Sequence, residues 1–188
     1  MRTLQRCFYY LILSAVVGYV YEFLLLEIVY DGFTNRGPTR GPYLWVYGVG
    51  GLVIILLLGP LRKRKLHIGK VPVTGVVIGA AIYAITSVVE YFASWLMQQL
   101  TGVCTWNYTG KWLNLHGRIC FEDTFRFTLL GLFGIYIIVP LLDRFLAKAG
   151  PRVSTIIFWV LFGLVAIDCV TAAIWPMEVE ANPWTCPE

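Results

Sequence analysis

Long runs of apolar residues alternate with short polar segments along the whole 188-residue chain. The runs cover about residues 7–30, 43–59, 72–100, 124–142 and 153–176. Because a helix of about 20 apolar residues crosses the hydrocarbon core of a bilayer, each run predicts a transmembrane helix. The second run is the shortest and should cross nearly upright, whereas the third is long enough to tilt or protrude. The pattern predicts an all-α membrane protein with five transmembrane helices in one bundle.

Composition supports this class. Hydrophobic residues make up 58% of the chain and charged residues only 14%, and the mean hydropathy is +0.70. Such values lie far from those of soluble domains. No long linker, low-complexity segment or clear internal repeat divides the chain, so we expect one polytopic membrane domain over residues 1–188. The net charge of +4 does not indicate a nucleic-acid partner here, because its distribution along the chain reports membrane orientation instead.

Lysines and arginines concentrate on one side of the predicted spans. With the N-terminus inside, the cytoplasmic segments hold ten of the 15 basic residues: Arg2, Arg6, Arg62, Lys63, Arg64, Lys65, Lys70, Arg144, Lys148 and Arg152. Basic residues favour the cytoplasmic side of a membrane. This asymmetry predicts an N-in, C-out topology and a multi-pass location in a cell membrane.

An alternative for the first run is a cleaved signal peptide, since Arg2 and Arg6 precede it. We reject that alternative because the run exceeds a signal-peptide core and carries Glu22 and Glu27 where small residues would be expected.

Among the five cysteines, Cys104, Cys120 and Cys186 fall on the outer side. A disulfide could persist there, and free thiols fit the sequence equally well. No C-x-x-C pair is present, so we expect neither a metal site nor a cofactor.

Carboxylates inside the spans are the first candidates for function. There are four, Glu22, Glu27, Glu90 and Asp168, and each lies in the outer half of its span. An acidic residue at the centre of a membrane helix costs about 2.5 to 3.5 kcal/mol, so such residues normally face a protein interior or a wet cavity and have a partner. The inner halves of the spans carry no charge, so the charged residues of the predicted bundle are confined to its outer half.

Arginines of the outer loops are the natural partners for these carboxylates. Arg36 and Arg40 lie in the segment NRGPTRGP, and Arg118 lies in the second outer loop. A guanidinium suits both a buried carboxylate and a phosphate or carboxylate ligand. The glycines and prolines around Arg36 and Arg40 predict an ordered turn, followed by a helix with a close-packing face at Gly48 and Gly51. An ordinary solvent-exposed turn remains the alternative.

The second outer loop combines aromatic residues with polar ones. Its tryptophans and tyrosine are typical of interfacial anchors. Anchoring does not explain why Asn114, His116 and Arg118 follow so closely. A lone histidine such as His116 is more often structural than a ligand, and both readings stay open.

Several ordered motifs carry a resemblance to a known family. The segment NRGPTRGPYLWVYGVG is similar to the N-R-G-x-x-x-G-P-x-x-x-x-Y-G-x-G motif of the bacterial family labelled putative ABC-transporter type IV, or CmpB-like, which is distantly related to the transmembrane 229 proteins. The segment from Glu90 to Leu132 resembles that family's Glu-Tyr helix, tryptophan-rich loop and N-x-x-G-R-(I/V)-C element. Asp168 falls where the family tends to have an aspartate. Two departures are Asn107, where an aspartate is usual, and Pro38, where an aromatic residue is common.

The resemblance implies a permease-like or transport protein with a polar carboxylate and arginine site in the outer leaflet. The residues expected to bind substrate are Glu22, Asn35, Arg36, Arg40, Glu90, Asn114, His116, Arg118 and Asp168. Beyond the lipid bilayer, the expected partners are a small anionic or amphipathic ligand and a separate ATPase or membrane subunit, because the chain carries no Walker motif.

Two other functions remain open. One is a membrane-embedded enzyme that acts on a lipid-linked substrate at the outer leaflet, although the sequence shows no recognised catalytic constellation. The other is a non-catalytic scaffold or accessory protein, because structural ion-pair networks resemble functional sites in sequence.

Overall fold

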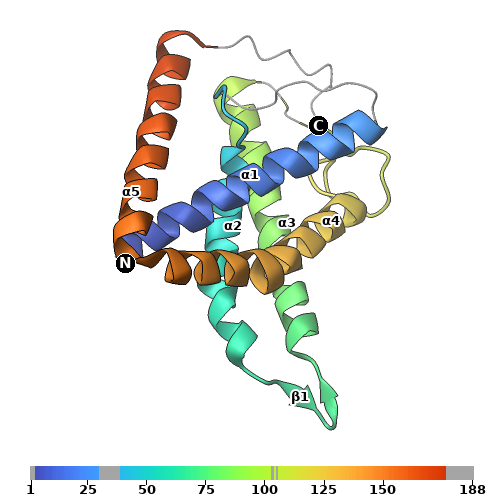
Figure 1. Ribbon diagram of the computed structural model, residues 1–188. Coiled ribbons are helices and arrows are strands. Elements are labelled where there is room, and N and C mark those ends of the chain that lie inside the picture. Colours follow the sequence, from blue (N-terminus) through green and yellow to red (C-terminus); the bar gives the residue numbers. More distant parts are fainter. Residues whose placement is uncertain (1–2, 30–38, 103, 105, 177–188) are drawn as a thin grey trace. The chain divides into compact units, whose positions relative to one another are not determined.

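The computed structural model describes residues 3–29, 39–102, 104 and 106–176, and most of these residues are helical (Figure 1). The α-helices are α1 (Thr3–Val29), α2 (Trp45–Leu58), α3 (Thr74–Thr101), α4 (Phe121–Phe133) and α5 (Val139–Ile174). A 3₁₀ turn, η1 (Gly59–Lys63), follows α2, and a π-helical turn, η2 (Gly134–Ile138), joins α4 to α5. Strands β1 (His67–Ile68) and β2 (Val71–Pro72) form an antiparallel hairpin, with Ile68 opposite Val71.

Four helical segments are long and apolar enough to cross a membrane: Thr3–Leu25, Trp45–Lys63, Thr74–Leu100 and Phe121–Ile174. The first three correspond to the first three predicted spans. The last is one helical segment of 54 residues that contains both the fourth and the fifth. The sequence pattern predicts a loop between those two spans. Residues 143–152 instead continue the helix, because the polar residues there are good helix formers and the break is confined to Gly150.

Large apolar side chains are widely exposed on these helices. On α3, for example, Val76, Val88 and Phe92 are more than half exposed. A soluble protein rarely leaves so much apolar surface in water. The exposed faces are therefore suited to contact with lipid tails, and the chain is a multi-pass membrane protein.

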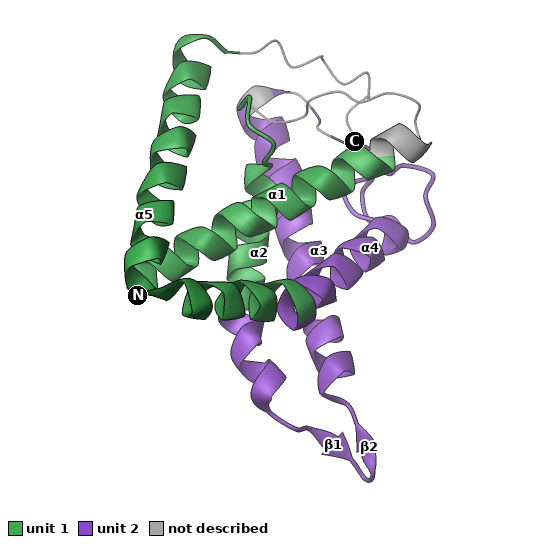
Figure 2. Cartoon of the chain, viewed as in Figure 1, with its two compact units in different colours: residues 1–55, 137–180 green, residues 56–136, 181–188 purple. Residues whose placement is uncertain are grey.

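The chain divides into two compact units (Figure 2). Unit 1 comprises residues 1–55 and 137–180, and so contains α1, most of α2 and all of α5. Unit 2 comprises residues 56–136 and 181–188, with η1, the hairpin, α3 and α4. Each unit is described below by itself.

In unit 1, α2 packs closely against α1 through glycines. A β-carbon added at Gly51 would lie 2.5 Å from both Cβ and Oγ of Ser14, and one added at Gly48 would lie 3.0 Å from Cβ of Ala15. The neighbouring Gly50 has no atom within 4 Å of its would-be β-carbon. The predicted close-packing face at Gly48 and Gly51 is thus confirmed, because a larger side chain at either position would push the helices apart.

Helix α5 bends sharply at Gly150, whose φ of 78° and ψ of 168° are not helical. Pro151 follows and could not donate a helical hydrogen bond. Two hydroxyls stabilise the elbow: Ser154 Oγ donates to the carbonyl of Leu146 at 3.4 Å, and the phenol of Tyr9 donates to the carbonyl of Ser154. Tyr9 also packs with Leu146 and Phe158 in the core of this unit.

In unit 2, α3 and α4 are antiparallel neighbours. Close approach is possible at Gly79, whose would-be β-carbon lies 3.5 Å from Leu132 and 3.9 Å from Thr128. Residues of α3 at intervals of four lie along one helix face, and here that face changes character along its length. Ile78 and Ile82 are fully buried in its first half, whereas Glu90 and Ser94 are buried in its second.

Candidate functional site

The predicted site residues are distributed over both units. Glu22, Arg40 and Asp168 belong to unit 1, and Glu90, Asn114, His116 and Arg118 belong to unit 2. Asn35 and Arg36 lie outside the described residues. The structure therefore presents two polar groups, one in each unit.

The loop before α2 surrounds the Asp168 carboxylate in unit 1. Oδ1 accepts a hydrogen bond from the backbone N–H of Arg40 at 3.2 Å, and Oδ2 accepts one from the backbone N–H of Gly41 at 3.0 Å. The Tyr43 hydroxyl donates a third. Burial and the nearby Asp168 carboxylate raise the pKa of the Tyr43 phenol, so Tyr43 stays a donor at neutral pH. Asp168 is therefore well satisfied, as expected of a residue that anchors a loop.

Among the described residues, the Arg40 guanidinium forms no ion pair with a carboxylate, contrary to the expectation from sequence. It donates to the carbonyl of Trp175 at 2.7 Å, just beyond the end of α5. Arg40 contacts Asp168 through its main-chain N–H instead. A cation at the C-terminal end of a helix is favourable for its dipole. In the same unit, Glu22 of α1 accepts a hydrogen bond from the hydroxyl of Tyr47 in α2.

Glu90 is the most buried acidic residue of the predicted site, with 9% of its surface exposed. Its partners are two hydroxyls: Tyr108 donates to Oε1 at 3.1 Å, and Thr124 of α4 donates to Oε2 at 3.4 Å. Burial, followed by the charge of Glu90, raises the pKa of the Tyr108 phenol, which keeps it a donor. No lysine or arginine within the described chain forms an ion pair with Glu90.

Arg118, in the loop before α4, reaches the same face of α3 one turn beyond Glu90. Nη1 donates to Ser94 Oγ at 3.2 Å, and Nη2 donates to the side-chain oxygen of Gln98. The guanidinium carbon is 6.0 Å from the centre of the Tyr91 ring. The arginine is 7% exposed, and every one of these neighbours is neutral. The pairing with a carboxylate expected from sequence is thus not formed by Arg118 among the residues that the structure describes.

The loop that carries Arg118 is tightly organised. Trp106 Nε1 donates to the Arg118 carbonyl at 2.8 Å, and Gly117 N donates to the Asn114 side chain at 3.1 Å. The exposed His116 has a φ of 52°, in the left-handed region that non-glycine residues adopt rarely. Its Nδ1 is 2.8 Å from the Tyr91 hydroxyl. Asn114 thus shapes the turn, and His116 lies at its outer edge.

A charged cluster at the start of α4 was not among the predicted site residues. Asp123 accepts from Lys111 at 2.6 Å, from Arg126 at 2.9 Å and from the Cys120 thiol at 3.0 Å. Acidic residues in the first turn of a helix and a cation three residues later favour this arrangement. The spacing of Asp123 and Arg126 is therefore sufficient to predict their ion pair from the sequence. Lys111 comes from the loop, and its contact with Asp123 could not be predicted in this way.

The cysteines follow the sequence expectation in part. Cys104 is disulfide-bonded, whereas Cys120 is a buried free thiol, and Cys186 lies outside the described residues. Burial and the hydrogen bond with Asp123 raise the pKa of Cys120 to about 11. Within the described residues, no group of three histidine, cysteine or acidic side chains could hold a metal ion.

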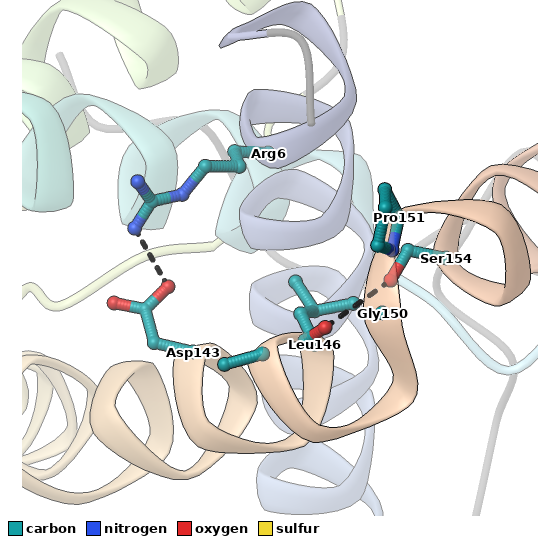
Figure 3. A pocket seen from close by; sticks show the side chains of 7 residues that line it. Arg6, Asp143, Leu146, Gly150, Pro151 and Ser154 are labelled. Atoms are coloured by element: carbon teal, nitrogen blue, oxygen red, sulfur yellow. Dashed lines mark hydrogen bonds and ion pairs between the residues drawn. The ribbon is translucent and has the colours of Figure 1, made fainter.

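An open pocket of about 480 Å³ lies at the α5 elbow in unit 1 (Figure 3). Its walls include Arg6 and Asp143, which form an ion pair at 2.8 Å, together with Gly150, Pro151 and Ser154. None of the predicted site residues lines it. Sequence reasoning treated Arg6 only as a topology signal, because its partner comes from a distant helix.

The model of the family described as "Putative ABC-transporter type IV" matches residues 8–173. The chain belongs to this family. The matched range includes every predicted site residue, and it contains both the Asp168 and the Glu90 groups. No curated protein and no solved structure matches the chain. Membership of this ABC-transporter-type family describes an integral membrane protein and leaves its substrate to be argued from the site.

Proposed function

We propose that this protein is a permease-type transport protein that binds a small solute at Glu90 and Arg118, in the outer half of its membrane domain. We further propose that it crosses the membrane five times, with the N-terminus inside. At 1.5 Å per residue the segment Phe121–Ile174 would be about 80 Å long, against a hydrocarbon core of about 30 Å. The elbow at Gly150 divides it into two crossings, and the basic residues Arg144, Lys148 and Arg152 flank that elbow.

The observation that carries the proposal is the environment of Glu90. A buried carboxylate within a membrane helix marks an ion or substrate pathway unless a cation neutralises it. Glu90 has two hydroxyl partners, and no ion pair with it is formed within the described residues. The contrast is Asp123, which lies in the same unit and is bound by two cations. Asp123 is thus assigned a structural role, and Glu90, which has hydroxyl partners and no ion pair among the described residues, is assigned to the solute.

The inner half of the same face of α3 is apolar, with Ile78 and Ile82 fully buried. The polar groups therefore do not continue along this face into the inner half of α3, which corresponds to an outward-facing state in a transport cycle. The same arrangement also favours a second candidate, an enzyme that acts on a substrate from the outer leaflet. Energy for transport would come from a separate ATPase subunit.

Uptake into proteoliposomes tests the proposal. The purified protein is reconstituted, a defined mixture of small carboxylates and phosphates is added outside, and the lumen is analysed by mass spectrometry. We expect unchanged solute to enter the lumen down its concentration gradient with the wild type, a movement that needs no ATPase, and this entry to be lost with Glu90→Gln. Glu122→Gln, at an exposed carboxylate paired with Arg126, is the matched control and should retain uptake. Chemically altered solute would favour the enzyme. Equal uptake by Glu90→Gln and the wild type would exclude Glu90 from the site.

A further inference from the structure

We infer that Arg118 binds an oxyanion, the carboxylate or phosphate group of the transported solute. This inference rests on the proposed function, because it names the chemical class of the ligand for the same site. It is carried by a different residue, and its test does not depend on transport.

Among the described residues, Arg118 differs in its partners from three other cations, each of which forms an ion pair with a carboxylate, whereas Arg40 and Arg62 donate to backbone carbonyls. Arg126 binds Glu122 and Asp123, Lys111 binds Asp123, and Arg6 binds Asp143. Arg118 is more buried than any of these three, yet the described partners of its guanidinium are a hydroxyl, an amide and an aromatic ring. A buried ion without a counter-charge is unfavourable, so an anion at this position would stabilise the protein.

The geometry leaves donors for that anion. A guanidinium has five N–H groups in one plane. Ser94 and Gln98 accept from two of them, so the remaining three can bind the two oxygens of a carboxylate or phosphate in a fork. The loop holds the arginine in place, since its backbone carbonyl accepts from Trp106 and its backbone N–H donates to Leu115 at 3.0 Å. Such preorganisation favours recognition of a planar or tetrahedral oxyanion.

Anion-dependent thermal stability tests the inference. The melting temperature of the full-length protein in detergent is measured against inorganic phosphate and acetate, with chloride holding the ionic strength constant. We expect saturable stabilisation by phosphate or acetate. Arg118→Gln should weaken the apparent affinity about tenfold or more, and Arg118→Lys should also weaken it, because an ammonium lacks the fork. Arg126→Gln should respond like the wild type. An equal response in all variants would be a general salt effect and would overturn the inference.

Adjacent glutamines provide a second test that leaves Arg118 in place. Gln98→Glu puts a carboxylate on Arg118, so this variant should melt at a higher temperature without added anion and should lose the response to phosphate. Gln99→Glu makes the same charge change at an exposed neighbour and should keep the response. If both variants keep it, Arg118 does not bind the anion.

Nanodiscs distinguish a solute from a lipid headgroup. If phosphatidylglycerol, compared with phosphatidylcholine, stabilises the wild type and not Arg118→Gln, while phosphate and acetate have no effect, the oxyanion belongs to a lipid. No response to any of these probes would overturn the inference. A response that depends on Arg118 in a protein that shows no uptake would support the anion site and refute transport.

Discussion

Replacement of Gly51 by alanine tests the packing of α1 against α2. The added β-carbon would lie 2.5 Å from Cβ and Oγ of Ser14, whereas carbon atoms normally approach to about 3.5 Å or more. The helices must therefore move apart by about 1 Å at this point. Overpacking of this kind costs about 1–3 kcal/mol. Alanine also favours a helix over glycine by about 0.5–1 kcal/mol, so the net loss should be smaller.

Gly50→Ala is the matched control, because nothing lies within 4 Å of its would-be β-carbon. The gain in helix propensity is common to both substitutions and cancels in their comparison. We therefore expect the free energy of unfolding of Gly51→Ala to be about 1–3 kcal/mol below that of Gly50→Ala. A second substitution, Ser14→Gly, removes the atoms that collide. The double variant should regain most of the loss, which a double-mutant cycle measures as coupling between the two positions.

The assay is thermal or dodecyl-sulfate unfolding in one detergent, followed by circular dichroism and by the folded fraction on size exclusion. The reasoning would be refuted if Gly51→Ala and Gly50→Ala had the same midpoint. It would also be refuted if Ser14→Gly failed to rescue Gly51→Ala, because the loss would then arise elsewhere than at this contact.

Three further outcomes are expected. Asp168→Ala should lower the free energy of unfolding by about 2–3 kcal/mol, because it removes a carboxylate that accepts hydrogen bonds from two amides and a phenol. Arg40→Ala should lower it by less than about 1 kcal/mol, since the backbone hydrogen bonds to Asp168 remain. Equal losses in thermal unfolding would contradict this. Cys120 should alkylate slowly at pH 8 and about tenfold faster per pH unit up to about pH 11; a plateau near pH 9 in a mass-spectrometric time course would contradict a raised pKa. The raised pKa means that the folded protein binds the Cys120 proton more tightly than the unfolded chain does. The protonated thiol should therefore contribute fully to the free energy of unfolding below about pH 9, and this contribution should be lost as the pH rises towards 11. Cys104 should remain unlabelled in denaturant until a reductant is added, and immediate labelling would exclude its disulfide.

Asp168 and Glu90 occupy similar positions in the sequence but have different hydrogen-bond partners, and for this reason we assign them different roles. Both lie in the outer halves of predicted spans. Asp168 is enclosed by amides of a glycine- and proline-rich loop, which saturate its oxygens. Glu90 is met only by hydroxyls from another loop and from α4. The first arrangement stabilises a turn, whereas the second includes no ion pair among the described residues, and this difference is the basis of the proposed solute site.

The sequence by itself determined the membrane class, the apolar runs, the lopsided placement of carboxylates and the packing face at Gly48 and Gly51. These features depend on local composition and on helical periodicity, which neighbours along the chain are sufficient to establish. It also located Glu90 and Arg118 as members of a polar group, because charges in apolar runs are costly wherever the chain goes.

Only the tertiary structure decided which atoms meet. It showed that residues 143–152 remain helical up to the elbow at Gly150, and that Arg40 reaches Asp168 through its main chain. It also placed Arg118 among neutral partners. Side-chain type predicts that an arginine and a carboxylate attract each other. Whether they meet depends on loop geometry and on competing donors tens of residues away, and for this reason the unpaired charge of Arg118 could not be read from the sequence.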